Sequence, residues 1–228
     1  MVIIGHRGCK KSGGENTLRN IKIALEAGAH GIEVDLRKFR DRIVILHDKT
    51  VDRTTDGKGL LKNLSETEFK LLTCKNGDSI PYLENVLCHL GKNISLFLEI
   101  KEIDCHKDIE RILSLNKAEL LNRKVNVTIS SFHSEVLYYF AKSTDWGLAM
   151  LFKEDIDTAL DICKKFTISE IHVSLNQLTD RNIRLIKKHN LRIFVYTVNH
   201  QCHYQQCKDY GVDGIITDVP DFLLKKRI

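Results

Sequence analysis

The sequence has few of the residues that break a chain into separate parts. Its 228 residues include only two prolines and one tryptophan, and no low-complexity tract. We therefore expect no linker and a single domain over residues 1–228. The longest apolar runs, such as ISLFLEI, fall far short of the roughly 20 residues that a membrane-spanning helix needs, so no membrane anchor is expected. No charged segment precedes an apolar one near residue 1, which argues against a secretory signal.

The sequence also argues against several common kinds of binding site. Seven cysteines are scattered without close pairs, which favours reduced thiols and a cytoplasmic location. The net charge of +5 suits a small anionic substrate but is too diffuse for a nucleic-acid partner. The segment TTDGKG does not have the G-x₄-G-K-[ST] spacing of a phosphate-binding P-loop, so we expect an ordinary turn there. The segment 199–207 contains His and Cys residues, but their spacing matches no standard zinc finger, so a solvated helix is the favoured interpretation.

Short β-rich runs alternate along the chain with amphipathic helical patterns, which is typical of a parallel sheet with helical crossovers. Helical spacing is found at 16–28, where Gly28 marks the end, and at 108–121, 134–142, 156–166 and 179–190, where Thr179 or Asp180 is a candidate N-cap. The nine strand-like runs are 2–5, 31–36, 43–47, 94–100, 125–131, 146–151, 170–175, 192–198 and 214–218.

Nine strands are one more than a (β/α)₈ TIM-type barrel needs. Only RKFRDR separates the second run from the third, which is too short for a helical crossover, so these two runs should form a hairpin. With Lys38 to Asp41 as the turn, Ile32 would face His47. The other eight runs predict an α/β fold of the (β/α)₈ type, with an insertion at about 48–92 after the second barrel strand. An open doubly wound sheet has the same alternation, but no G-x-G-x-x-G follows the first strand.

Acidic residues interrupt the apolar runs near the carboxyl ends of two strands, where active sites of such barrels lie. Glu33 and Asp35 are two residues apart in IEVDL and share a face, as do Glu99 and Lys101 in LEIK. Three converging carboxylates would repel one another unless a cation neutralised them. Oxygen ligands favour a hard ion, so we expect one divalent cation, Mg²⁺ or Ca²⁺.

Two histidines and an arginine should reach the same space. His6 and Arg7 follow the first strand, and the predicted hairpin brings His47 back beside Glu33. Arg7, Lys101 and the metal would hold the oxygens of a phosphoryl group, while His6 and His47 move protons. The set predicts binding and cleavage of a phosphate ester.

At this point the sequence resembles a known family. GHRG, ENTLRNI and AGAHGIEVDLRKFRDRIVILHDKTVDRTTDGKG, followed in order by IPYLENVL, LFLEIK, ISSFH, VYTVN and GVDGIITDVPD, look like the signature of the glycerophosphodiester phosphodiesterases. These enzymes share a TIM-type barrel with phosphatidylinositol-specific phospholipases C. The resemblance implies hydrolysis of a glycerophosphodiester to an alcohol and sn-glycerol 3-phosphate, with His6 and His47 as general acid and base in either order and Glu33, Asp35 and Glu99 as metal ligands.

The resemblance also implies a set of substrate contacts. Glu15 would be a further metal ligand or would orient Arg7. Tyr196 stands where the family often has tryptophan, and Gly14 where it usually has proline before ENT. The residues implied to contact phosphate or substrate are Arg7, Glu15, Asn16, Lys101, Phe132 and Tyr196.

Two other functions would fit a similar residue set. A lysophospholipase D would use the same catalytic residues on lipids with one acyl chain, but would need an exposed apolar rim. A non-catalytic phosphate-binding barrel would keep Arg7 and Lys101 and would not need His6 and His47. The presence of both histidines favours an enzyme.

Overall fold

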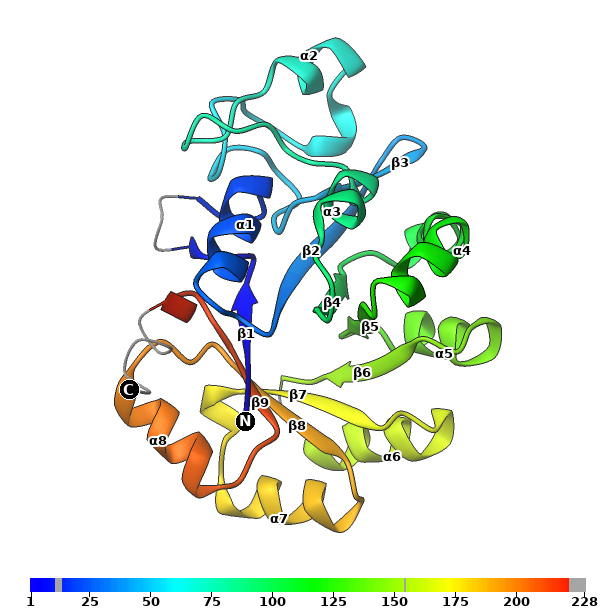
Figure 1. The fold of residues 1–228 in the computed structure, drawn as a ribbon. Helices are drawn as coiled ribbons and strands as arrows, with labels where there is room; N and C mark the ends of the chain where they lie inside the picture. Colours follow the sequence, from blue (N-terminus) through cyan, green and yellow to red (C-terminus); the bar gives the residue numbers. More distant parts are fainter. Residues whose placement is uncertain (11–13, 154, 222–228) are drawn as a thin grey trace.

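The fold was analysed in a computed structural model, which describes residues 1–10, 14–153 and 155–221. In these residues nine strands form one sheet in the order β1-β9-β8-β7-β6-β5-β4-β2-β3, and β1 also pairs with β2 (Figure 1). All neighbouring strands are parallel except β2 and β3. Eight parallel strands therefore close into the predicted TIM-type barrel, and β3 is added outside it.

All nine predicted strands are present, with ends shifted by a few residues at most positions. Each of them corresponds to one of the short β-rich runs in the sequence. Their bounds are β1 Val2–His6, β2 Gly31–Phe39, β3 Arg42–Ile45, β4 Ser95–Ile100, β5 Asn126–Ser131, β6 Gly147–Leu151, β7 Glu170–Ser174, β8 Arg192–Tyr196 and β9 Gly214–Thr217.

Helices surround the barrel, and one of them begins at a predicted cap, Thr179. Thr17 accepts a hydrogen bond from the Asn20 N–H at the start of α1, and Thr179 caps α7 in the same way. A (β/α)₈ fold would have a helix after its last strand, and most of that stretch falls outside the described residues. The helices are α1 Leu18–Glu26, α2 Glu66–Leu71, α3 Leu83–His89, α4 His106–Asn122, α5 Ser134–Ser143, α6 Ile156–Phe166, α7 Asp180–Lys188 and α8 Gln201–Asp209, with short 3₁₀ turns at Leu61–Asn63, Ile103–Cys105 and Leu175–Gln177.

The β2–β3 hairpin forms as predicted, but its predicted register is wrong by two residues. Phe39 pairs with Arg42 and Leu36 with Ile45, so only two residues make the turn. Arg40 adopts φ of 55°, the left-handed conformation that a tight two-residue turn requires. Glycine or asparagine usually marks such a turn, and neither is present here. The shift by an even number keeps each side chain on its predicted face.

The segment after β3 forms a small unit of its own beside the barrel. It carries α2 and projects beyond β2 and β3, away from β7 and β8 (Figure 1). Its core is separate from that of the barrel and consists of Phe39, Val44, Leu46, Val51, Leu61, Phe69, Leu72, Cys74 and Ile80. The following helix, α3, instead buries Leu83, Val86 and Leu87 in the main core, so it is the crossover helix that leads to β4.

The barrel interior is tightly packed below the site. Ile4, Phe97, Phe194 and Ile216 form a buried cluster inside it, and the Phe97 and Phe194 rings meet edge to face at 4.9 Å. Gly31 lies where β2 passes β4, and a Cβ atom there would come within 2.1 Å of the Ser95 carbonyl oxygen. Glycine at this position therefore permits the close approach of two strands.

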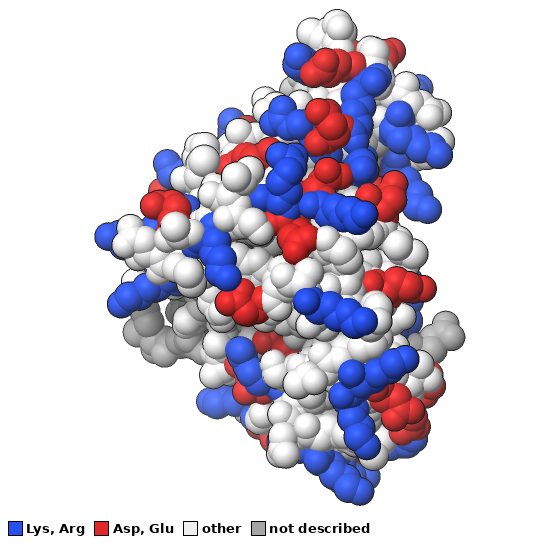
Figure 2. Space-filling view, turned by 90° about the vertical axis from the view of Figure 1, so that its right-hand side faces the viewer, with Lys and Arg blue, Asp and Glu red and all other residues white. Residues whose placement is uncertain are grey.

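The surface carries charges of both signs. On the face seen in Figure 2, basic and acidic side chains are interspersed, so the net charge of +5 is not gathered there into one stripe. All seven cysteines are free thiols. In the described part of the chain, no helix has the length and apolar character needed to cross a membrane.

Candidate active site

The acidic residues meet because of the strand register. In β2 and β4, Asp35 lies directly opposite Glu99, and in β1 and β2, His6 lies opposite Glu33. Glu33, Asp35 and Glu99 each place a carboxylate oxygen within 4.8 Å of the other two. The convergence expected from the sequence is therefore present at the carboxyl ends of the strands.

Burial makes it costly to ionise all the carboxylates of this cluster. Glu33 and Asp35 are almost fully buried. Desolvation, together with the neighbouring Asp35 and Glu99 carboxylates, raises the pKa of Glu33 well above its usual value. Desolvation also acts on Asp35, but Lys101 and Arg7 outweigh it and lower the pKa of Asp35. The surroundings thus raise the pKa of Glu33 and lower the pKa of the neighbouring Asp35.

The residues fit a hard divalent cation. Glu33 Oε1 is buried and has no hydrogen-bond partner among the described residues, which is costly for an ionised carboxylate. A cation beside Glu33, Asp35 and Glu99 would satisfy this oxygen and relieve the repulsion. In the parts of the chain that the structure describes, this is the sole cluster of three or more His, Cys, Asp or Glu residues suited to a metal, and the His and Cys residues of 199–207 form none.

Arg7 and Lys101 lie against the carboxylates from two sides. Lys101 Nζ is 2.8 Å from Asp35 Oδ1 and also pairs with Glu99. Arg7 Nε is 3.0 Å from Asp35 Oδ2, and the Arg7 backbone N–H donates to Glu33 Oε2. The left-handed backbone of Arg7, with φ of 53°, turns both groups toward the cluster. The amide of Asn16 adds a hydrogen bond of 2.8 Å to Asp35.

His6 is held by a carboxylate that the sequence analysis missed. Its Nδ1 lies 2.7 Å from Asp218 Oδ1, while its Nε2 faces Glu33 at 4.0 Å. Asp218 itself is fixed by the amide of Asn199, which donates to its second oxygen at 2.7 Å. Asp218 follows β9 directly, so the rule that located Glu33 and Asp35 near a strand end would also have found it.

His47 has an equivalent arrangement. Its Nδ1 is 2.6 Å from the Asp48 carboxylate, and burial lowers the pKa of His47. Arg53 in turn donates from Nε to the other oxygen of Asp48 at 2.6 Å. A carboxylate at Nδ1 fixes the orientation of each imidazole and leaves Nε2 for the substrate. Asp48 and Arg53 were also missed by the sequence analysis, although the adjacent HD pair was a local signal for Asp48.

Glu15 binds arginines rather than the acidic cluster. It accepts hydrogen bonds from Arg7 at 2.8 Å and from two nitrogens of Arg53 at 2.6 and 2.9 Å. Although burial opposes ionisation, these arginines lower the pKa of Glu15 to about 2. Of its two expected roles, the contacts support the one in which Glu15 orients Arg7.

A cavity of about 600 Å³ joins these groups. Both histidines, Arg7, Glu99 and Lys101 line it, and Phe132 and Tyr196 form part of its wall. Lys153 lies over the Phe132 ring at 4.9 Å from the ring centroid. All the substrate-contact candidates except Glu15 and Asn16 thus line this cavity, and those two support it from behind through Arg7 and Asp35.

Comparison with known proteins gives this site its context. The model of the glycerophosphoryl diester phosphodiesterase family matches residues 6–222. The chain belongs to this family. A glycerophosphodiester phosphodiesterase of Caldanaerobacter subterraneus is 31% identical, over 98% of this chain and 96% of its own. The predicted assignment to an enzyme family of phosphodiesterases is therefore confirmed.

Solved structures agree with the fold. The glycerophosphodiester phosphodiesterase of Thermotoga maritima is 27% identical and superposes with a TM-score of 0.81, covering 100% of this chain and 98% of its own. An Oleispira antarctica phosphodiesterase, solved with its product sn-glycerol-3-phosphate, has a TM-score of 0.87 at 20% identity, over 99% and 96% of the two chains. The second likeness concerns the fold alone. Family members generally use a divalent metal, for which this chain has the acidic cluster described above.

Proposed function

We propose that this glycerophosphodiester phosphodiesterase hydrolyses glycerophosphodiesters to an alcohol and sn-glycerol 3-phosphate, using one divalent cation and two histidines. The observation that carries the proposal is the pairing of one acidic cluster with two imidazoles, each held at Nδ1 by its own carboxylate. A small-molecule diester that carries one negative charge suits a cavity lined by Arg7 and Lys101.

Glu33, Asp35 and Glu99 would hold the cation. When bound, the cation would act as a Lewis acid on the phosphoryl oxygens, and either Mg²⁺ or Ca²⁺ suits an all-oxygen set. Arg7 and Lys101 would bind and orient the phosphate. Phe132 and Tyr196 would cover the glycerol half, as the family resemblance implies.

His6 and His47 would carry out the proton transfers. One imidazole Nε2 accepts the proton of the attacking hydroxyl, and the other donates a proton to the departing alkoxide oxygen. The attacking oxygen comes from water or from the adjacent glycerol hydroxyl. In the second route the alcohol leaves behind a cyclic phosphodiester, which a water molecule then opens to glycerol 3-phosphate, and the same two histidines serve both steps. Asp218 and Asp48 keep the rings in the orientation that both transfers require.

The proposal is tested with purified protein and glycerophosphocholine. Glycerol 3-phosphate should form with Mg²⁺ or Ca²⁺ and should cease to form with EDTA. His6→Ala and His47→Ala should each lose at least about 100-fold in kcat while still binding the metal, because each removes a proton-transfer group and no ligand. The exposed residue His189 offers a matched control, since His189→Ala should retain activity. No product with any cation, or normal turnover by both active-site variants, would contradict the proposal.

A further inference from the structure

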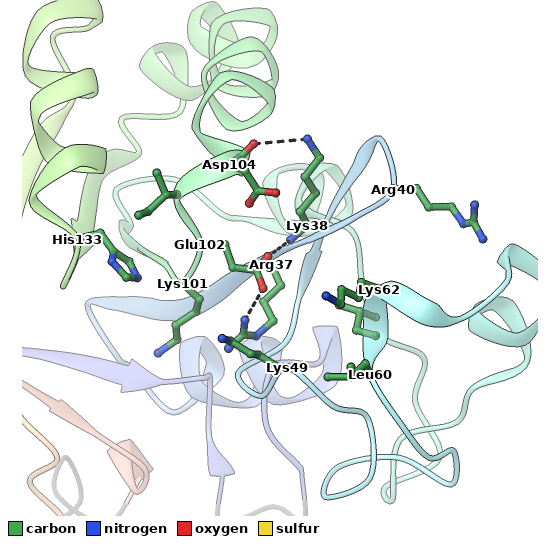
Figure 3. A pocket seen from close by; sticks show the side chains of 12 residues that line it. Arg37, Lys38, Arg40, Lys49, Leu60, Lys62, Lys101, Glu102, Asp104 and His133 are labelled. Carbon is green, nitrogen blue, oxygen red and sulfur yellow. Dashed lines mark hydrogen bonds and ion pairs between the residues drawn. The ribbon is translucent and has the colours of Figure 1, made fainter.

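A second cavity, of about 670 Å³, opens beside the catalytic one and has no role in the proposed chemistry. It lies between the β2–β3 hairpin, the 3₁₀ turn at Leu61–Asn63 and the segment after β4 (Figure 3). Arg37, Lys101 and His133 line both cavities. The two spaces are therefore adjacent and share part of their walls, and a substrate whose phosphate sits at Arg7 could extend toward the second one.

The wall of this cavity is strongly basic. Two acidic residues, Glu102 and Asp104, face six cationic ones, which are Arg37, Lys38, Arg40, Lys49, Lys62 and Lys101.

Half of these cations are neutralised by the protein itself. Arg37 is 2.6 Å from Glu102, Lys38 is 2.8 Å from Asp108, and Lys101 pairs with Asp35. Such pairs leave little net field for a ligand.

The other three cations have no carboxylate partner among the residues that the structure describes. Lys49 and Lys62 form no ion pair within the described chain, and Arg40 donates only to the Leu64 carbonyl at 3.0 Å. Figure 3 shows the Lys49 and Lys62 side chains on the same side of the cavity, near Arg37. A cavity wall with unpaired cations concentrates anions, so this space is suited to a negatively charged group.

We propose that the alcohol half of the preferred substrate carries a second anionic group, a phosphate, which binds in this basic cavity. The inference rests on the proposed function. Glycerol is the constant half of every glycerophosphodiester, so only the alcohol can supply the group that reaches Lys49 and Lys62. The reaction stays the same hydrolysis, and the cavity selects among alcohols by charge.

The test compares two substrates that differ by one phosphate, glycerophosphoinositol and glycerophosphoinositol 4-phosphate. Wild-type protein should show a kcat/KM about tenfold higher for the phosphorylated one, since several screened charge pairs together give an effect of this order. The ratio should fall toward one in the double variant Lys49→Ala/Lys62→Ala and at high ionic strength. The control Lys92→Ala/Lys188→Ala removes two exposed lysines elsewhere and should keep the ratio.

The outcomes separate the two proposals. If neither these substrates nor glycerophosphocholine is cleaved, the proposed function fails, and this inference fails with it. If glycerophosphocholine alone is cleaved, only the inference is overturned. If both are cleaved with equal kcat/KM, or if the variant keeps the wild-type ratio, only the inference is overturned.

The cavity wall also includes the exposed apolar side chains of Leu60 and Ile103. Faster cleavage of lysophosphatidylcholine than of the phosphorylated substrate would assign the cavity to an acyl chain and would likewise overturn the inference.

Discussion

Arg53 binds Glu15 with two guanidinium nitrogens, at 2.6 and 2.9 Å, although the two residues are 38 positions apart. Arg53 belongs to the segment that projects beside the barrel, and Glu15 to the loop after β1. Through Asp48 the same arginine also reaches His47. One side chain thus ties the projecting segment both to the carboxylate that holds Arg7 and to one of the two cavity histidines.

Removal of this link should destabilise the protein in a pH-dependent way. Burial opposes ionisation of Glu15, but Arg53 and Arg7 prevail and lower its pKa to about 2. A lowered pKa contributes stability that is complete above the unfolded value near 4.5 and is lost as the pH falls toward 2. Arg53→Ala should therefore cost about 1–3 kcal/mol at pH 7, and the difference from wild type should shrink below about pH 4.

Urea unfolding of both proteins at neutral and acidic pH measures this difference. Arg181→Ala is the matched control, because its ion pair with Asp157 is well exposed on both sides and should contribute under about 1 kcal/mol. An equal loss of stability at pH 7 and pH 3 would show that Arg53 acts through packing rather than through the Glu15 charge.

Asp218 should matter for turnover rather than for substrate binding. Asp218→Asn keeps the shape of the side chain but replaces the charge at His6 Nδ1, so the ring loses its preferred tautomer. We expect kcat to fall by about 10–100-fold with little change in KM. Steady-state kinetics with glycerophosphocholine measure both constants. Asp161→Asn, on the exposed face of α6, serves as the control, and a kcat equal to wild type in Asp218→Asn would remove Asp218 from the mechanism.

Glu33→Gln should weaken cation binding. The substitution keeps the volume but removes the charge of a buried oxygen ligand, and we expect the Kd for Mg²⁺ or Ca²⁺ to rise by at least about tenfold. Since burial and the neighbouring carboxylates raise the pKa of Glu33, cation binding to wild type should also weaken as the pH is lowered. Calorimetric titration follows both effects. Glu26→Gln on the exposed face of α1 should bind like wild type, and an unchanged Kd in Glu33→Gln would exclude Glu33 as a ligand.

Gly31→Ala tests the close packing of the barrel wall. The added methyl group would meet the Ser95 carbonyl oxygen at 2.1 Å, and backbone atoms of a central strand cannot move away easily. We expect a loss of about 1–3 kcal/mol in the free energy of unfolding. Gly91→Ala is the comparison, because no atom lies within 4 Å of the position that its added methyl group would take. Denaturant unfolding of the two variants should differ clearly, and equal stability would contradict the packing argument.

The barrel could be predicted because its signals are local. Apolar runs such as those of β4 and β9 differ sharply from the polar residues around them, and helical spacing separates most of them. Residues at strand ends on one face, such as Glu33 and Asp35, could be placed together by the alternation of a strand alone. The short link between β2 and β3 allowed no connection other than a hairpin.

The features that escaped prediction depend on conformations or contacts that no local pattern marks. The hairpin register follows from the left-handed Arg40, whose residue type gives no hint of that conformation. The pairing of Arg53 with Glu15 requires the path of the projecting segment, which only its separate packing around Phe69 decides. Asp218 differs from these two, because its place directly after β9 and the predicted closure of the barrel beside β1 were signals that the sequence offered.

That closure has a consequence for a chain that is still being made. Both histidines and all three acidic ligand candidates lie within the first 99 residues, whereas Asp218 is 212 positions beyond His6. A ribosome therefore releases the acidic cluster long before the carboxylate that steadies His6. The contact that orients His6 therefore exists only once the last strand has been made and has paired with β1, so the site as described needs the whole barrel.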